Sequence, residues 1–216
     1  MKPRVGILIS GRGSNMAAIV AAAQDPAYPA TIACVLSNRP DATGLKTAAA
    51  QGIPTLCVDH KHFASREAFE DELNRQLDAL DVDFVVLAGF MRVLTERFIG
   101  HWDGKLVNIH PSLLPAFPGL HTHRQALAEG VRIHGCTVHF VTPTLDHGPI
   151  IIQAAVPVLD SDDEATLAAR VLRQEHLIYP QAVRWFAAGQ LSLADGRVRL
   201  ADEMADSAVL TAPALR

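Results

Sequence analysis

Two polar side chains at the end of an apolar run are the clearest candidates for chemistry in this sequence. Asn108 and His110 lie two residues apart, where the run 106–109 meets the proline-bounded segment 111–115. Residues two apart on a strand point to the same face, so we expect the amide and the imidazole to converge just beyond the strand end. Two converging donors can hold the oxygen of a tetrahedral intermediate. The motif therefore predicts acyl-group chemistry.

Asp146 is the carboxylate that could support this pair. It lies in the turn-rich segment 142–148. Aspartate is common in turns because it bonds to its own backbone, and that interpretation stays open. If the segment folds back beside His110, the carboxylate would favour the charged imidazolium. A charged ring would be a stronger partner for a developing oxyanion than a neutral one.

A glycine-rich segment, Ser-Gly-Arg-Gly-Ser-Asn at 10–15, lies between a short apolar run and a helical pattern. Glycines allow a tight turn and close approach to a ligand, and a helix N-terminus attracts phosphate. The segment lacks the third glycine of a dinucleotide fingerprint, because position 16 is Met16, and it also lacks a P-loop lysine. It predicts a monophosphate site, while a plain strand-to-helix turn remains the alternative.

The pattern of elements that would position these residues is that of an α/β protein. Short apolar runs alternate with helical spacings up to residue 110, which indicates a doubly wound, mostly parallel, Rossmann-like sheet. The C-terminal half predicts two antiparallel strands, a long helix from about Asp163 that Pro180 should kink or split, and a small hairpin. We expect 1–200 to form a single domain and 201–216 a mobile tail. The runs that we expect to be strands are 5–9, 31–36, 55–58, 84–87, 106–109, 135–141 and 149–158.

The composition limits the class of protein. The 216 residues are 49% hydrophobic and 19% charged, with a formal net charge of -4 and no Lys/Arg block, so neither nucleic acid nor a membrane is expected as a partner. The three cysteines, Cys34, Cys57 and Cys136, have no metal-type spacing. We expect them to be buried free thiols of a cytoplasmic protein.

Ten histidines raise the question of a metal site. No HExxH pair and no Cys/His finger spacing is present, so we expect no metal and interpret the other histidines as surface and loop residues. These include His121, His123, His134, His139 and His147. A serine hydrolase is equally weakly supported, because no serine lies in a GxSxG context.

Two further segments have open interpretations from their residues alone. The apolar segment 90–94 follows a predicted strand and is either core or the lining of a pocket for a flat ligand. Glu175, inside the long helix, belongs to a run that usually forms a solvated helix face.

Taken together, these motifs resemble those of a known family. The segment 108–115, Asn-Ile-His-Pro-Ser-Leu-Leu-Pro, is similar to the signature of the folate-dependent formyltransferases. The segments 10–15, 88–92, 118–123 and 174–176 narrow the resemblance to those members that formylate glycinamide ribonucleotide in purine synthesis. The similarity extends from about residue 5 to 200.

The resemblance implies transfer of a formyl group from 10-formyltetrahydrofolate to the amine of glycinamide ribonucleotide, without a metal. It implies a monomer or homodimer in the cytoplasm, and a water-assisted proton transfer in which His110 takes part. Asn108, His110 and Asp146 would be catalytic. Gly13, Ser14, Asn15, Arg173, Gln174 and Glu175 would bind the ribonucleotide. Arg66, Met91, Arg92, Val93, Leu94, Asn108, Thr142, Pro143, Thr144, Leu145 and Asp146 would bind the folate.

The resemblance leaves two departures and several alternatives. His147 occupies a position where a small residue is common in the family, and the tail after Leu200 matches nothing. A formyltetrahydrofolate hydrolase would carry an additional N-terminal domain, and an initiator-tRNA formyltransferase an additional C-terminal one. A non-catalytic nucleotide-binding module is the alternative from another class. The loop 111–121 is a candidate for closure over the ligands.

Overall fold

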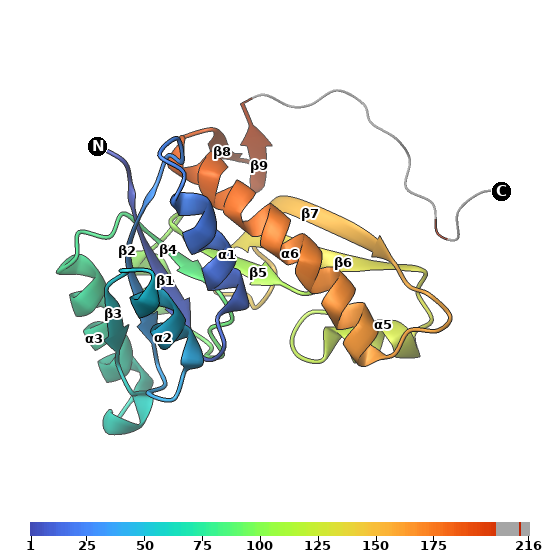
Figure 1. The fold of residues 1–216 in the computed structure, drawn as a ribbon, viewed down its shortest axis with the longest axis horizontal. Helices are drawn as coiled ribbons and strands as arrows, with labels where there is room; N and C mark the ends of the chain where they lie inside the picture. Colours follow the sequence, from blue (N-terminus) through green and yellow to red (C-terminus); the bar gives the residue numbers. More distant parts are fainter. Residues whose placement is uncertain (202–211, 213–216) are drawn as a thin grey trace.

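A seven-stranded mixed sheet forms the centre of the computed structural model, which describes residues 1–201 and 212 (Figure 1). The strand order is β3-β2-β1-β4-β5-β6-β7. Strands β1 to β5 are parallel, whereas β6 pairs antiparallel with both β5 and β7. The strands are β1 (Arg4–Ile9), β2 (Thr31–Ser37), β3 (Thr55–Cys57), β4 (Phe84–Leu87), β5 (Leu106–His110), β6 (Ile133–Phe140) and β7 (Ile150–Pro157).

Helices cover both faces of this sheet. On the near side in Figure 1, the long helix α6 crosses the sheet beside α1, and the two helices are in direct contact. On the opposite face, α3 and α4 pack against the sheet. The helices are α1 (Ser14–Ala23), α2 (Thr43–Ala50), η1 (His60–His62), α3 (Arg66–Asp78), α4 (Glu96–His101), α5 (Thr122–Ala128) and α6 (Glu164–Ala187). The predicted α/β fold class is therefore confirmed.

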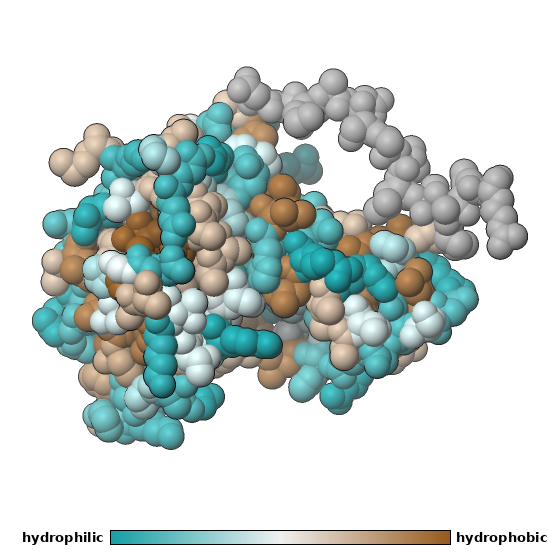
Figure 2. All heavy atoms as spheres, in the orientation of Figure 1, coloured by the Kyte–Doolittle hydropathy of each residue, from teal (hydrophilic) through white to brown (hydrophobic). Residues whose placement is uncertain are grey.

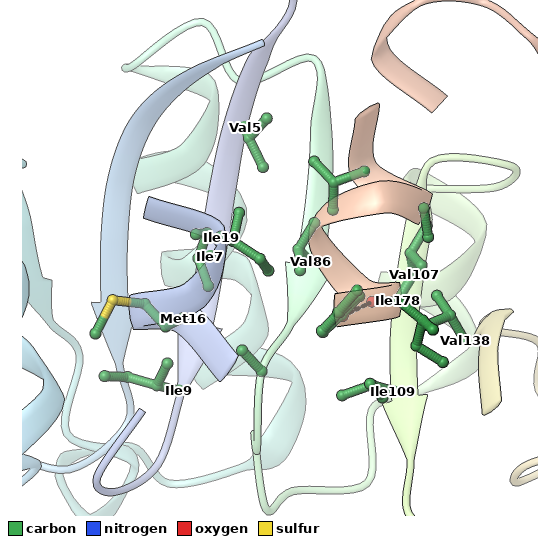
Figure 3. Close-up of a cluster of buried hydrophobic side chains, with 14 of the residues drawn as sticks. Val5, Ile7, Ile9, Met16, Ile19, Val86, Val107, Ile109, Val138 and Ile178 are labelled. Atoms are coloured by element: carbon green, nitrogen blue, oxygen red, sulfur yellow. Dashed lines mark hydrogen bonds between the residues drawn. The ribbon is translucent and has the colours of Figure 1, made fainter. Parts of the chain in front are cut away.

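Two hydrophobic clusters explain why the apolar runs form buried parallel strands. Alternate residues of β1 point to opposite faces, as strand geometry requires: Ile7 belongs to the cluster under α1 and α6, and Leu8 to the cluster under α3 and α4. Figure 3 shows the first cluster, where Met16 and Ile19 of α1 and Ile178 of α6 approach the strands. Burial on both faces removes the polar alternation of a half-exposed strand.

Side-chain caps begin three of the α-helices. Ser65 accepts a hydrogen bond from the Ala68 amide at 3.1 Å at the start of α3. Thr95 caps α4 in the same way. Asp163 and Thr166 form a reciprocal capping box at the start of α6. Each cap satisfies backbone N–H groups that have no partner within the helix.

Pro180 was expected to kink or split the long helix, and the split does not occur. Helix α6 runs without interruption through this residue. Pro180 is buried, and its carbonyl accepts a hydrogen bond from the Tyr28 hydroxyl at 2.7 Å. The neighbouring Tyr179 hydroxyl donates to the carbonyls of Leu87, at the end of β4, and Val107, near the start of β5. This packing against the sheet offsets the hydrogen bond that proline cannot make.

The expectation that all three cysteines are buried is also wrong for one of them. Cys34 and Cys136 are buried free thiols, whereas Cys57 is exposed. Cys57 ends β3, the strand at the edge of the sheet. The apolar run around Cys57 had indicated burial. However, β3 has a neighbouring strand on one side only, so the end of this strand remains exposed.

Hydrophobic residues reach the surface in scattered spots between hydrophilic ones on the side that Figure 2 shows. The predicted hairpin is present as β8 (Leu191–Ala194) and β9 (Arg197–Leu200), paired antiparallel. Within the described residues, no helix is long and apolar enough to cross a membrane. The expected mobile tail 201–216 lies outside the described residues, apart from 201 and 212.

Candidate active site

The polar side chains singled out in the sequence lie at the carboxyl edge of the parallel strands, where open α/β sheets bind ligands. A hollow of about 340 Å³ opens there beside the glycine-rich loop. Its lining also includes Arg39, at the end of β2. Arg39 was not among the predicted site residues. The lining residues are Ser10, Gly11, Arg12, Gly13, Ser14, Asn15, Arg39, Ala88, Gly89 and Met91.

Gly13 begins helix α1 in the left-handed conformation, with φ of 70° and no side-chain cap. The first amides of α1 therefore have no capping side chain, which suits an anion. Gly44 of α2 supports the loop from behind, because its amide donates to the Gly11 carbonyl at 3.1 Å. A Cβ at position 44 would lie 2.6 Å from the Ile9 side chain, so this close approach needs glycine.

The structure brings His110 and Asp146 together. The His110 Nδ1 atom lies 3.5 Å from Asp146 Oδ2, and the two side chains are only 6% and 8% exposed. The other ring nitrogen, Nε2, lies 3.0 Å from the Phe117 carbonyl, to which it donates. Both ring nitrogens therefore face acceptors. The charged imidazolium, with two N–H groups, can satisfy both at once, whereas a neutral ring can satisfy only one.

The backbone around Asp146 holds its carboxylate toward this ring. Asp146 has a φ of 50°, a left-handed conformation that aspartate tolerates better than most residues. Its Oδ2 atom also accepts a hydrogen bond from the Gly119 amide at 2.8 Å. The carboxylate thus joins the loop after β5 to the loop after β6. His147, the next residue, has an exposed side chain.

Asn108 lies on β5 two residues before His110, in register with His139 on β6. Its Nδ2 atom is 3.3 Å from His139 Nε2. His139 was expected to be a surface or loop histidine, but this residue is only 2% exposed. Neighbours across an antiparallel pair share a face. The alternation along 135–141 was the one sequence signal that could have indicated this position.

Glu175 is buried rather than solvated, so the usual interpretation of its helix run does not hold. Asn15 Nδ2 donates to Glu175 Oε2 at 2.6 Å, which joins the start of α1 to the middle of α6. Burial raises the pKa of Glu175, and the Asn15 hydrogen bond and the charge of His110 oppose that rise. Its predicted neighbours differ: Arg173 is exposed and Gln174 is half-buried.

The apolar segment after β4 is divided between the core and the surface. Phe90 and Leu94 are buried in the cluster under α3 and α4. Met91 and Val93 are exposed by 66% and 58%, as is Leu145 by 60% in the loop after β6. Exposed apolar side chains of this size suit an apolar ligand. The other predicted folate contacts are half-buried or exposed polar positions and one exposed proline: Arg66, Arg92, Thr142, Pro143 and Thr144.

No group of three or more metal-ligating side chains occurs in the described part of the chain. His123 and His134 lie together, with His123 Nδ1 3.2 Å from His134 Nε2. Burial lowers the pKa of His134 to about 4, and the charge of the neighbouring His123 is the second influence that lowers it. The arrangement as a whole offers amide and imidazole donors, two carboxylates with little exposed surface, Asp146 and Glu175, and an open helix N-terminus.

Comparison with known proteins gives a consistent result. Residues 3–183 match the model of a family described as formyl transferase. The chain is 51% identical over 187 residues to the phosphoribosylglycinamide formyltransferase of Escherichia coli, covering 87% of this chain and 88% of that protein. It superposes with a TM-score of 0.90 on glycinamide ribonucleotide transformylase 1 from Symbiobacterium toebii, at 48% identity over 92% and 94% of the two chains. A formyltetrahydrofolate deformylase from Pseudomonas syringae is also similar, at 28% identity and a TM-score of 0.84, with 66% of that chain covered.

Proposed function

Because this chain belongs to the formyl transferase family, we propose that it transfers the formyl group of 10-formyltetrahydrofolate to the amine of glycinamide ribonucleotide, in purine biosynthesis. The observation that carries this proposal is the 51% identity to the Escherichia coli enzyme across nearly the full length of both chains. The close approach of His110 and Asp146, at the same sheet edge as the glycine-rich hollow, supports it.

The proposed chemistry is attack of the substrate amine on the formyl carbon. Asn108 and the protonated ring of His110 stabilise the oxyanion that forms, and Asp146 maintains the charge on that ring. In the structure His110 Nε2 donates to the Phe117 carbonyl, so a substrate oxygen would replace this acceptor. The oxyanion then collapses to the new amide as the bond between the formyl carbon and N10 of the folate breaks. A proton passes from the attacking nitrogen to the leaving N10 through an ordered water, with His110 taking part as a general acid.

We propose that the ribonucleotide phosphate binds at Gly13, Ser14 and Asn15. The uncapped start of α1 and the adjoining hollow support this placement. Glu175, hydrogen-bonded to Asn15, would contact the glycinamide part, with Arg173 and Gln174 beside it. A carboxylate near the amine would help to orient the nucleophile.

We propose that the folate lies along the loops after β4 and β6. The exposed side chains of Met91, Val93 and Leu145 support this placement, because these two loops present apolar groups to solvent. Val141, at the start of the loop after β6, packs against the hydrophobic cluster that also holds Phe90 and Leu94. The proposed folate residues are Arg66, Met91, Arg92, Val93, Leu94, Asn108, Thr142, Pro143, Thr144, Leu145 and Asp146.

We further propose that residues 1–200 form one functional domain and that the enzyme works in the cytoplasm as a monomer or homodimer. The three free cysteines agree with a reducing compartment. The net charge of -4 gives no support for a nucleic-acid partner.

One assay tests the proposal against its rivals. The protein is mixed with 10-formyltetrahydrofolate, with and without glycinamide ribonucleotide, and the folate absorbance is followed. Turnover only with the ribonucleotide is the expected result. Turnover without it would identify a hydrolase, the activity of the deformylase to which this chain is 28% identical. No turnover in either mixture would leave a nucleotide-binding module as the better description.

A further inference from the structure

His139 lies outside the group of residues to which the proposed function assigns a role. It is on β6, directly opposite Asn108 of β5, and its side chain is buried. A buried histidine must place both ring nitrogens against partners or leave a costly unpaired group. The partners of the two nitrogens therefore reveal what the ring does.

The two hydrogen bonds of His139 define its tautomer. Nδ1 lies 2.8 Å from the Phe140 carbonyl, which can only accept, so Nδ1 carries the proton. Nε2 lies 3.3 Å from Asn108 Nδ2, which can only donate, so Nε2 offers its lone pair. The neutral ring with its proton on Nδ1 is the form that satisfies both contacts.

This tautomer also settles which way the Asn108 amide faces. Rotating the amide by half a turn would place its oxygen against the Nε2 lone pair, acceptor against acceptor. A charged His139 ring would place an N–H against the Asn108 N–H. Burial is the largest influence on the pKa of His139 and lowers it. The hydrogen bond to the Phe140 carbonyl is the next influence and opposes this shift. The buried ring therefore stays neutral and keeps the observed amide orientation.

We propose that His139 is a positioning residue: by accepting one N–H of Asn108 Nδ2, it fixes the amide so that the second N–H remains for the formyl oxygen. This inference rests on the proposed function of Asn108 as an oxyanion donor. His139 itself need not touch either substrate. Its effect on turnover should therefore pass entirely through Asn108.

A double-mutant cycle tests this coupling. His139→Leu removes the acceptor and should lower kcat roughly fivefold or more, as expected for a lost buried hydrogen bond, with both KM values within about twofold of wild type. In the Asn108→Ala background the same change should have no further effect on kcat. Val156→Ala on β7 is the matched control: its buried side chain lies away from Asn108, so it should lower Tm but leave kcat unchanged.

Wild-type kcat in His139→Leu would overturn the proposal, as would an equal loss in the Asn108→Ala background. If His139→Leu does not fold, nitrogen NMR of the wild-type ring decides the matter. A protonated Nδ1 and an unprotonated Nε2 are expected, and the opposite tautomer or a charged ring would overturn it. If the wild-type protein does not transfer a formyl group, the proposed function is contradicted instead. The NMR measurement of the His139 tautomer would still test the hydrogen bond to Asn108 in that case.

Discussion

The Asp146 carboxylate lies 3.5 Å from Nδ1 of His110, and both side chains are almost completely withdrawn from solvent. A substitution that removes the negative charge of Asp146 but keeps the shape of its side chain isolates the contribution of that charge to turnover. Asp146→Asn can still accept from the Gly119 amide, but it no longer stabilises an imidazolium. We expect kcat to fall roughly tenfold or more, since hydrogen bonds to charged groups contribute about 1.5–3 kcal/mol. Steady-state kinetics at saturating substrates measures this.

The control for this change is Asp160→Asn, because Asp160 pairs with Arg132 at the surface, where its side chain is 87% exposed. It should leave kcat unchanged. Equal turnover in Asp146→Asn and Asp160→Asn would show that the buried charge does not act in the reaction.

The two proposed oxyanion donors should each be needed for fast turnover. Asn108→Ala and His110→Ala remove one donor apiece, and losing such a donor typically lowers kcat roughly 100- to 1000-fold. His62→Ala, at an 80% exposed side chain on η1, should behave as wild type. Single-turnover formyl transfer gives the chemical step directly. Near-wild-type rates in either donor variant would rule out the assignment.

Glu175 is expected to lower stability while it aids binding. Burial raises its pKa in the folded protein, so the folded state holds this proton more tightly than the unfolded chain. The free energy of unfolding should then fall as pH rises from the ordinary carboxyl value through the raised one. Glu175→Gln removes this dependence, so its Tm should exceed that of wild type above the raised pKa.

The same change should weaken substrate binding. Loss of the carboxylate is expected to raise the KM for glycinamide ribonucleotide by roughly 10- to 100-fold, the range for hydrogen bonds to charged groups, and to leave the KM for folate unchanged. Thermal melts across pH and initial-rate kinetics check the two halves separately. A lower Tm in Glu175→Gln than in wild type at every pH of the series would contradict the stability half.

Local patterns predicted much of the fold and part of the site. Continuous apolar runs located β1, β2, β4 and β5, because strands buried on both faces need no polar alternation. The two-residue spacing of Asn108 and His110 predicted a shared face on β5. Each of these inferences depends on residues that are close together in the chain.

Contacts between distant segments could not be obtained in this way. His139 faces Asn108 only because of the register of the antiparallel β5–β6 pair, and Glu175 meets Asn15 only because α6 packs beside α1. Pro180 is a further case in which the local sequence was not sufficient. Local propensity predicts a break in the helix there, but tertiary packing keeps the helix intact. Registers and packing partners depend on the whole chain.

Arg170 and Asp162 form an ion pair that should matter for stability rather than activity. The guanidinium donates to both Asp162 oxygens, at 2.6 and 2.7 Å, and to the Pro157 carbonyl, which joins the end of β7 to α6. Arg170→Ala should lower the free energy of unfolding by about 1–3 kcal/mol. Arg132→Ala, which breaks an exposed pair with Asp160, should cost less than about 1 kcal/mol. Denaturant unfolding compares them, and kcat should not change in either.

The pH dependence of this pair has a definite sign. Hydrogen bonds from Arg170 lower the pKa of Asp162 to about 2. A carboxyl whose pKa is depressed by folding contributes stability above its ordinary value of about 4 and loses it as pH falls toward 2. The gap between wild type and Arg170→Ala should therefore close on acidification. A gap that stays constant across this range would mean that the charge of Asp162 is not responsible.

Cys57 should be the reactive thiol of the folded protein. Cys34 and Cys136 are buried, and burial raises their pKa to about 11 and about 12, so few thiolates form and none is accessible. Cys57 is exposed at the end of the edge strand β3, although partial burial raises its pKa as well. Because the chain has three cysteines, a thiol reagent should modify one group in the native protein and three after unfolding. Cys57→Ser should abolish the native reaction without changing kcat. Rapid native modification of a second thiol would mean that β2 or β6 opens far more readily than its burial indicates.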